Sequence, residues 1–329
     1  MIGIQDLVEL PFTPDLTEGG ITYACRSLPH TYGRLGRSSI DRIRRRTGEA
    51  IVELAFRRYL SRQSIPFDVK SVEPFTEPGG YSVSLGGRRC DLKPFLISHR
   101  SQIAALRAEP GLLLKAPALI PLDQYSADGD QARDLYLFAF LTGLIADLPA
   151  DLKKASSASL PTHLIHIMPP AWVRPQTWNP LGPLTLKSDA NEILTLEIGG
   201  QGADREFLTC SLDLPPRTRI VAKGDFYSLA YLHVKTQPDA QFGVFSPSRK
   251  ETYLVNPGEW GNIWIYGMDI YLAGWISRYE FRQRASLIPE GSRVFQYDHT
   301  HTKNLAVPIA ELKPLAELFE RVREWQGLK

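Results

Sequence analysis

Proline divides this chain into two stretches of different character, and this division constrains the fold more than any other feature. Seven prolines lie between residues 147 and 190, a density that interrupts helices and strands. Before them, a long helical pattern is followed by β-like segments. After them come short β-prone segments separated by turn residues. We therefore expect a mixed α/β (α+β) protein with a domain over residues 1–150, a proline-rich connection over 151–190 and a β-rich domain over 191–329.

The composition places this protein among soluble ones. With 329 residues, of which 43% are hydrophobic, the chain can form a large core in one or two domains. Its three cysteines are far apart and odd in number, which favours a reducing compartment over a disulfide framework. The first twenty residues carry acidic but no basic side chains, unlike a signal peptide, and no apolar run reaches membrane-spanning length. We expect a cytoplasmic protein without a membrane segment.

One long helix is expected from Ser38 or Ser39 to about Arg62. Apolar residues recur there at spacings of three and four, and either serine can cap the start. The window from residue 26 to residue 62 holds ten arginines against Asp41, Glu49 and Glu53. Because a planar guanidinium binds phosphate oxygens in pairs, the window suits contact with a nucleic-acid backbone. The same arginines also suit the solvated face of an ordinary helix, and both interpretations stay open.

A β-hairpin is expected over residues 81–97. Residues alternate between apolar and polar up to Leu85, and Gly86-Gly87 is a two-residue turn signal. Residues two apart on a strand share a face, so Asp91 and Lys93 point the same way while the residues between them face the core. An acid and an amine are thus held side by side, as metal-assisted phosphodiester hydrolysis requires.

The order of a helix with Glu53, a strand, a loop with Glu77 and a hairpin with Asp91 and Lys93 resembles the PD-(D/E)XK nuclease family over roughly residues 38–97. The resemblance implies a restriction-endonuclease-like mixed sheet flanked by helices. It also implies that Glu53, Glu77 and Asp91 bind Mg²⁺ or Mn²⁺ and that Lys93 positions or activates water. No small organic cofactor is expected.

One position departs from the family pattern. With Gly86-Gly87 as the turn, Lys93 lies opposite Gly80, and the place of the family's proline and aspartate is taken by Pro78-Gly79-Gly80. The aspartate is missing. Either Glu77 replaces it from the loop, or the site is degraded.

Three hypotheses follow. The first is a Mg²⁺-dependent DNA endonuclease of restriction or mobile-element type, active as a homodimer because symmetric cutting of a duplex favours two-fold symmetry. The second is a catalytically impaired nucleic-acid-binding or scaffolding protein with the same fold. The third is a β-rich interaction protein in which the arginines are surface charge. Under the first two, the residues expected to contact DNA are Arg37, Arg42, Arg45, Arg46, Arg88, Arg89 and Arg100.

Some weaker patterns give further expectations. Residues 98–108 suggest a short helix, residues 112–121 a buried strand, and residues 135–141 a strand or the start of a helix. The glycine-rich segment 199–202 suggests a hairpin turn. Asp134-Leu135-Tyr136 is one of three places where aspartate, an apolar residue and tyrosine begin a β-like run. Histidine pairs at 163/166 and 299/301 lack the partners of a zinc site.

Overall fold

The computed structural model describes residues 1–31, 39–69, 83–127 and 133–327. The chain forms two compact units, each assembled from separate segments. The first unit comprises residues 1–20, 48–144 and 266–329, and the second comprises residues 21–47 and 145–265. This grouping differs from the consecutive domains expected from the sequence. Residues 266–329 belong with the first unit because a late strand pairs inside its main sheet.

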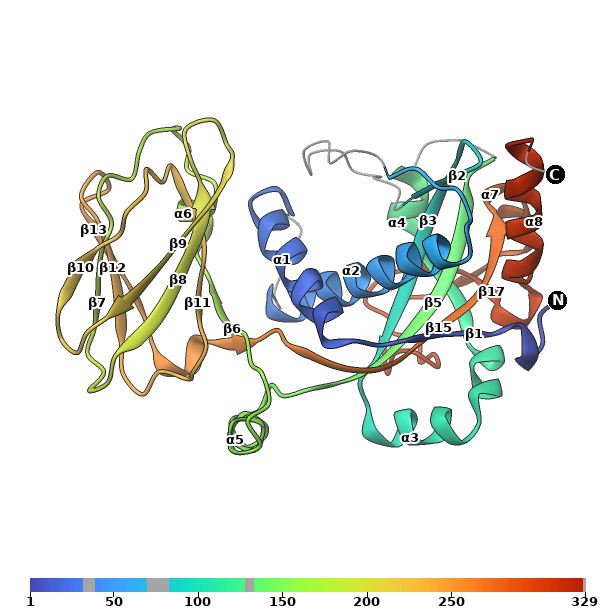
Figure 1. The fold of residues 1–329 in the computed structure, drawn as a ribbon, viewed down its shortest axis with the longest axis horizontal. Helices are drawn as coiled ribbons and strands as arrows, with labels where there is room; N and C mark the ends of the chain where they lie inside the picture. The colour runs from blue at the N-terminus through green and yellow to red at the C-terminus, as the bar shows by residue number, and fades with distance from the viewer. Residues whose placement is uncertain (32–38, 70–82, 128–132, 328–329) are drawn as a thin grey trace. The chain divides into compact units, whose positions relative to one another are not determined.

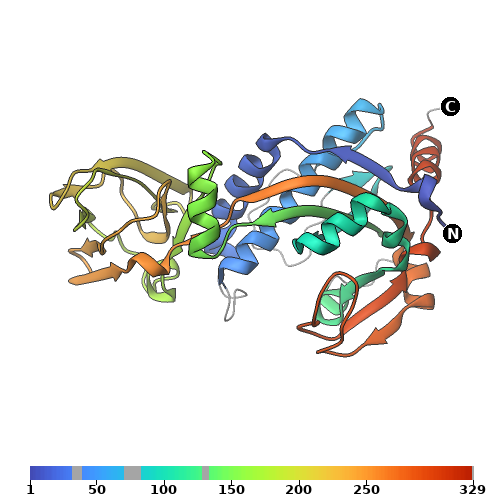
Figure 2. The ribbon, with the colours of Figure 1, turned by 90° about the horizontal axis from the view of Figure 1, so that it is seen from below.

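The main sheet of the first unit has five strands among the described residues, in the order β1-β15-β5-β3-β2. Their bounds are Val8–Pro11 for β1, Ile265–Ser277 for β15, Leu135–Ile145 for β5, Arg88–Ile97 for β3 and Val83–Leu85 for β2. Strands β3 and β5 run parallel, whereas β2 pairs antiparallel with β3. The long strands β5 and β15 lie beside each other in Figure 2. The result is a mixed sheet in an α+β unit.

The predicted hairpin is confirmed where the structure describes it. Val83 pairs with Cys90 and Leu85 with Arg88, which is the register that a Gly86-Gly87 turn requires. Both glycines have positive φ angles, 57° and 74°, and a tight turn between twisted strands needs this conformation. The strand expected before the hairpin is represented by one bridge, Asp68 to Ser84, and its later part lies outside the described residues.

Helix α2 covers one face of this sheet, and a smaller sheet covers the other together with α3, α4 and α7 (Figures 1 and 2). The helix predicted from residue 38 or 39 is α2, which crosses the sheet. The helices are α1 (Pro14–Thr31), α2 (Ser39–Arg62), α3 (Arg100–Ala108), α4 (Leu122–Ala127), α7 (Arg278–Arg284) and α8 (Leu315–Trp325). The smaller sheet has the order β16-β17-β4, with bounds Ser286–Ile288, Asn304–Pro308 and Pro117–Pro121.

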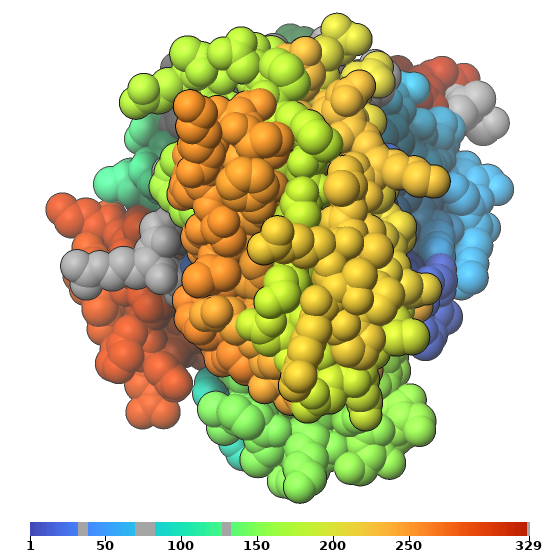
Figure 3. All heavy atoms as spheres, turned by 90° about the vertical axis from the view of Figure 1, so that its left-hand side faces the viewer, coloured from blue at the N-terminus to red at the C-terminus, as the bar shows by residue number. Residues whose placement is uncertain are grey.

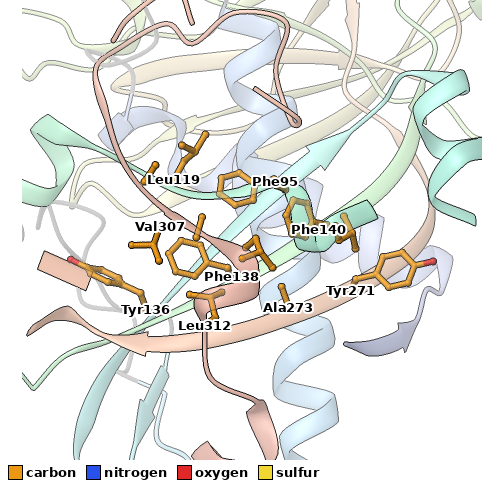
Figure 4. Packing of buried hydrophobic residues seen from close by; sticks show 14 of the residues in the cluster. Phe95, Leu119, Tyr136, Phe138, Phe140, Tyr271, Ala273, Val307 and Leu312 are labelled. Atoms are coloured by element: carbon orange, nitrogen blue, oxygen red, sulfur yellow. The ribbon is translucent and has the colours of Figure 1, made fainter. Parts of the chain in front are cut away.

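The core of the first unit lies between the two sheets. Figure 4 shows aromatic residues of β3 and β5 packed against residues of β4, β15 and β17. Phe138 and Phe140 are fully buried, and Phe95 is 6.4 Å from Phe138 and 5.4 Å from Phe140 between ring centroids. Tyr136 lies at one end of this cluster, and its hydroxyl points away from the other labelled residues (Figure 4). The sheet face therefore changes from apolar to polar along its strands.

The second unit is mainly antiparallel β-structure. Its sheets have the orders β14-β6-β11-β8-β9 and β10-β7-β12-β13 among the described residues. The strands are β6 (Leu164–Ile167), β7 (Thr185–Ser188), β8 (Leu194–Gln201), β9 (Phe207–Leu214), β10 (Arg219–Val221), β11 (Ser228–Val234), β12 (Phe242–Ser246), β13 (Glu251–Val255) and β14 (Gly261–Asn262). Two short helices, α5 (Pro149–Ser157) and α6 (Pro170–Val173), precede most of them. Figure 3 looks onto this unit, with its later strands in yellow and orange.

Two local predictions are wrong. Residues 112–115 belong to a 3₁₀ helix, Pro110–Lys115, and the strand expected there begins only at Pro117. The glycine-rich segment is not a turn, because Gly199 and Gly200 lie inside β8. These glycines allow close approach instead: a Cβ on Gly199 would meet the Tyr231 ring at 2.2 Å, and one on Gly200 would meet the Ser228 carbonyl at 2.0 Å.

Candidate functional site

The hairpin brings Asp91 and Lys93 together, as the sequence predicts. Their side chains meet on one face of β3, with 2.5 Å between Lys93 Nζ and Asp91 Oδ2. The neighbouring Cys90 and Leu92 are buried on the opposite face. Only 8% of the Lys93 side chain is exposed, against 23% for Asp91. Within the described part of the chain, the Lys93 ammonium finds no hydrogen bond of regular geometry, so the Asp91 carboxylate is its main electrostatic partner.

Glu53, the predicted helical ligand, lies on α2. It lies one turn before Arg57, with which it forms an ion pair, and its side chain is 21% exposed. Burial raises the pKa of Glu53 above its ordinary value, Arg57 opposes this shift, and the negative charges of Glu49 and Asp91 raise the pKa further. The charge of Asp91 is the smallest of these contributions to the pKa of Glu53.

The polar character of this face continues onto the neighbouring strand β5. Asp91 is in register with Tyr136, and the Lys93 ammonium lies 5.8 Å from the centre of the Tyr136 ring. The Tyr136 hydroxyl accepts a hydrogen bond of 2.8 Å from Arg278. Arg89 Nε and Asp134 Oδ2 are 3.8 Å apart at the start of the two strands. We call Arg89, Asp91, Lys93, Asp134 and Tyr136 the polar face.

Two of the predicted metal ligands, Glu53 and Asp91, are among the described residues. Carboxylate oxygens are the donors that Mg²⁺ and Mn²⁺ prefer, so both side chains have the chemistry of such a ligand. Within the described ranges, no three histidine, cysteine, aspartate or glutamate side chains gather as a metal site would need. Glu77, the third predicted ligand, lies outside those ranges.

The arginines predicted to contact DNA are distributed over both units. Arg42, Arg45 and Arg46 are exposed on the part of α2 that belongs to the second unit. In the first unit, Arg88 and Arg89 are half-buried at the start of β3, and the exposed Arg100 begins α3. Arg37 lies outside the described residues.

The histidines of the second unit have structural surroundings. His166 Nδ1 lies 3.0 Å from the Glu259 carbonyl oxygen, and its Nε2 lies 3.0 Å from the Tyr253 hydroxyl. His163 stacks on His233 with 3.4 Å between ring centroids. Burial lowers the pKa of all three imidazoles.

Sequence reasoning did not find the long-range members of the site. Asp134 and Tyr136 were noticeable only as part of an aspartate-apolar-tyrosine pattern, and no local signal connected them with Asp91. Arg278 is separated from its partner Tyr136 by 142 residues. The parallel pairing of β3 with β5 brings Asp134 and Tyr136 to Arg89 and Asp91, and Arg278 follows β15, the other neighbour of β5.

Comparisons with family models, curated proteins and solved structures give no match for this chain. No helix in the described ranges is both long and apolar enough to cross a membrane.

Proposed function

We propose that this protein is a metal-dependent DNA endonuclease of the PD-(D/E)XK type, of restriction or mobile-element kind. The observation that supports the proposal is the pairing of Asp91 with Lys93 on one face of β3. A strand-borne acid and amine side by side are part of the arrangement that the family resemblance implies, and Glu53 on α2 is the helical glutamate of that pattern. The mixed sheet flanked by helices is compatible with a restriction-endonuclease-like fold.

Each residue has a distinct role in this proposal. Asp91 and Glu53 would hold a Mg²⁺ or Mn²⁺ ion through their carboxylate oxygens, with Glu77 as a further ligand. The chemistry that such an ion supplies is a water of lowered pKa and neutralisation of charge on the phosphate. Lys93 is buried beside Asp91, where its ammonium can orient a water or stabilise the negative charge that develops on the phosphate. Arg278 positions the Tyr136 ring beneath that ammonium.

Plasmid cleavage tests the proposal. Purified protein is incubated with supercoiled DNA and Mg²⁺ or Mn²⁺, and nicked and linear products are measured. We expect cleavage by the wild type and a loss of at least about 100-fold in Asp91→Ala and Lys93→Ala, in line with the loss of an electrostatic catalytic group. Lys154→Ala, which removes an exposed amine in the second unit, is the matched control and should cleave normally. No cleavage by the wild type with either metal would reject the enzyme.

A second candidate is a nucleic-acid-binding protein with a disabled site. It is favoured because Asp91 is already paired with Lys93 and the described residues form no cluster of three possible metal ligands. DNA binding without cleavage, weakening steeply as salt rises, would support this candidate. Absence of DNA binding would leave a β-rich interaction protein. A homodimer would be the expected state only for the enzyme.

A further inference from the structure

A second feature of the first unit lies at the hairpin turn. A cavity of about 350 Å³ is lined by residues 86–89, Arg133, Asp134 and Trp325. The cavity thus joins the hairpin turn to the end of α8, which contributes Trp325. The lining carries three guanidinium groups and one carboxylate, and is therefore strongly positive.

Two of the lining arginines have no ion-pair partner among the described residues. Asp134 lies near Arg89, whereas no described carboxylate ion-pairs with Arg88 or Arg133. Burial lowers the pKa of Arg88, and the positive charges of Arg133 and Arg321 lower it further. Three positive charges that converge on one cavity with a single lining carboxylate favour the binding of an anion.

Trp325 holds Arg88 in a defined position. The Arg88 guanidinium carbon lies 3.7 Å from the centre of the indole ring. Stacking uses the flat face of the guanidinium and leaves its N–H groups, which lie in the plane, available to oxygen atoms. Gly86 makes this packing possible, because a Cβ on it would meet Trp325 Cε3 at 2.8 Å. An arginine fixed in this way loses little side-chain entropy when it binds a ligand.

We infer that this cavity, which we call the arginine pocket, binds the terminal phosphate monoester of a nucleic-acid strand. A monoester carries close to two negative charges at neutral pH, which matches three guanidinium groups less one carboxylate. An internal phosphodiester carries only one negative charge, so it matches the charge of this positive pocket less well. Arg88 and Arg133 are the main ligands of the phosphate oxygens.

The pocket shares Arg89 and Asp134 with the polar face. Arg89 and Asp91 are two residues apart on β3, which is about 7 Å at the usual rise of a strand. A strand end anchored in the arginine pocket would therefore pass Asp91 with one of its first phosphodiester groups. The choice of nucleic acid as the carrier of the phosphate rests on the proposed function.

Binding of short oligonucleotides tests the inference. Fluorescein-labelled 12-mers with a 5′-phosphate, a 3′-phosphate or neither are titrated with the full chain in EDTA, so that no cleavage occurs. We expect at least about tenfold tighter binding of a phosphorylated 12-mer, about 1.4 kcal/mol. Inorganic phosphate should reduce this preference by competition. Arg88→Gln/Arg133→Gln should abolish it, and Arg133→Gln, which changes an exposed side chain, should weaken it.

Arg293→Gln is the matched control, since it removes an exposed arginine of the same unit that does not line the pocket. It should keep the full preference. Equal binding of phosphorylated and unphosphorylated strands by the wild type would overturn the inference, as would a preference that persists in the double variant. Cleavage without a terminal-phosphate preference would reject the pocket alone. A preference without cleavage would reject the endonuclease and leave the pocket.

Discussion

Strands β3 and β5 carry two contrasting regions on the same sheet face. Toward their ends, Phe95, Phe138 and Phe140 form a closely packed aromatic cluster. Toward their starts, the polar face replaces these rings with Arg89, Asp91, Lys93, Asp134 and Tyr136. The backbone pairing is continuous across both regions. The fold therefore does not require charge at one end of the face.

Under the proposed function, the polar face serves catalysis rather than stability. Removing charges from water costs free energy, and apolar residues of similar size are often as stable or more stable in the same place. The Lys93 ammonium is nearly inaccessible and depends on Asp91. The aromatic region stabilises the unit. Apolar residues in place of the polar face would stabilise it more than the charged residues do. Four predictions test this contrast.

The largest effect is expected in the aromatic region. Phe138→Ala should lower the free energy of unfolding by about 3–5 kcal/mol, because it removes a fully buried ring and leaves a cavity. Urea denaturation followed by circular dichroism measures it. Phe138→Leu, which keeps much of the volume, should lose clearly less. A loss below about 1 kcal/mol for the alanine variant would mean that this region is not the main core.

Breaking the charge pair should cost somewhat less. Asp91→Ala leaves the buried Lys93 ammonium without its partner and should lower the free energy of unfolding by about 2–3 kcal/mol. This loss is smaller than for a fully buried ion pair because Asp91 is partly exposed. The same urea titration measures it. An unchanged midpoint would show that the Lys93 ammonium is better solvated than its burial indicates.

Replacing both charges should reverse the sign. Asp91→Leu/Lys93→Met should be as stable as the wild type or more stable by about 1 kcal/mol, because apolar contacts replace a desolvated ion pair. It should also lack all metal-dependent cleavage. A double variant less stable than Asp91→Ala would show that the pair is a structural element.

The smallest effect is a pH dependence at Glu53. A carboxyl whose pKa is raised in the folded state stabilises that state below its unfolded pKa, and this contribution is lost as pH rises through the folded pKa. Glu53→Gln resembles the protonated form, so its stability relative to the wild type should increase from pH 4 to pH 8. Urea midpoints across this range measure the trend. The opposite trend would mean that Arg57 outweighs burial and the charges of Glu49 and Asp91.

Local signals predicted the parts of the site that are local. The hairpin and its register followed from Gly86-Gly87 and the alternation beside it, and α2 followed from its apolar spacing. The contact of Trp325 with Arg88 could not be predicted, because 237 residues separate them in the chain and only tertiary packing joins them. The same holds for β15, which pairs in the main sheet of the first unit although it follows most of the second unit in the chain. For this reason the bounds of the two compact units do not coincide with the proline-rich segment.

The most direct test of the polar face is calorimetric titration of the protein with Mn²⁺ in the absence of DNA. The wild type should bind the ion with an affinity that falls as pH is lowered, because Glu53 must release its proton. Asp91→Asn and Glu53→Gln should each abolish or strongly weaken this binding, while Glu49→Gln should retain it. Equal binding by the wild type and Asp91→Asn, or no binding by the wild type, would contradict the assignment of a metal to these carboxylates.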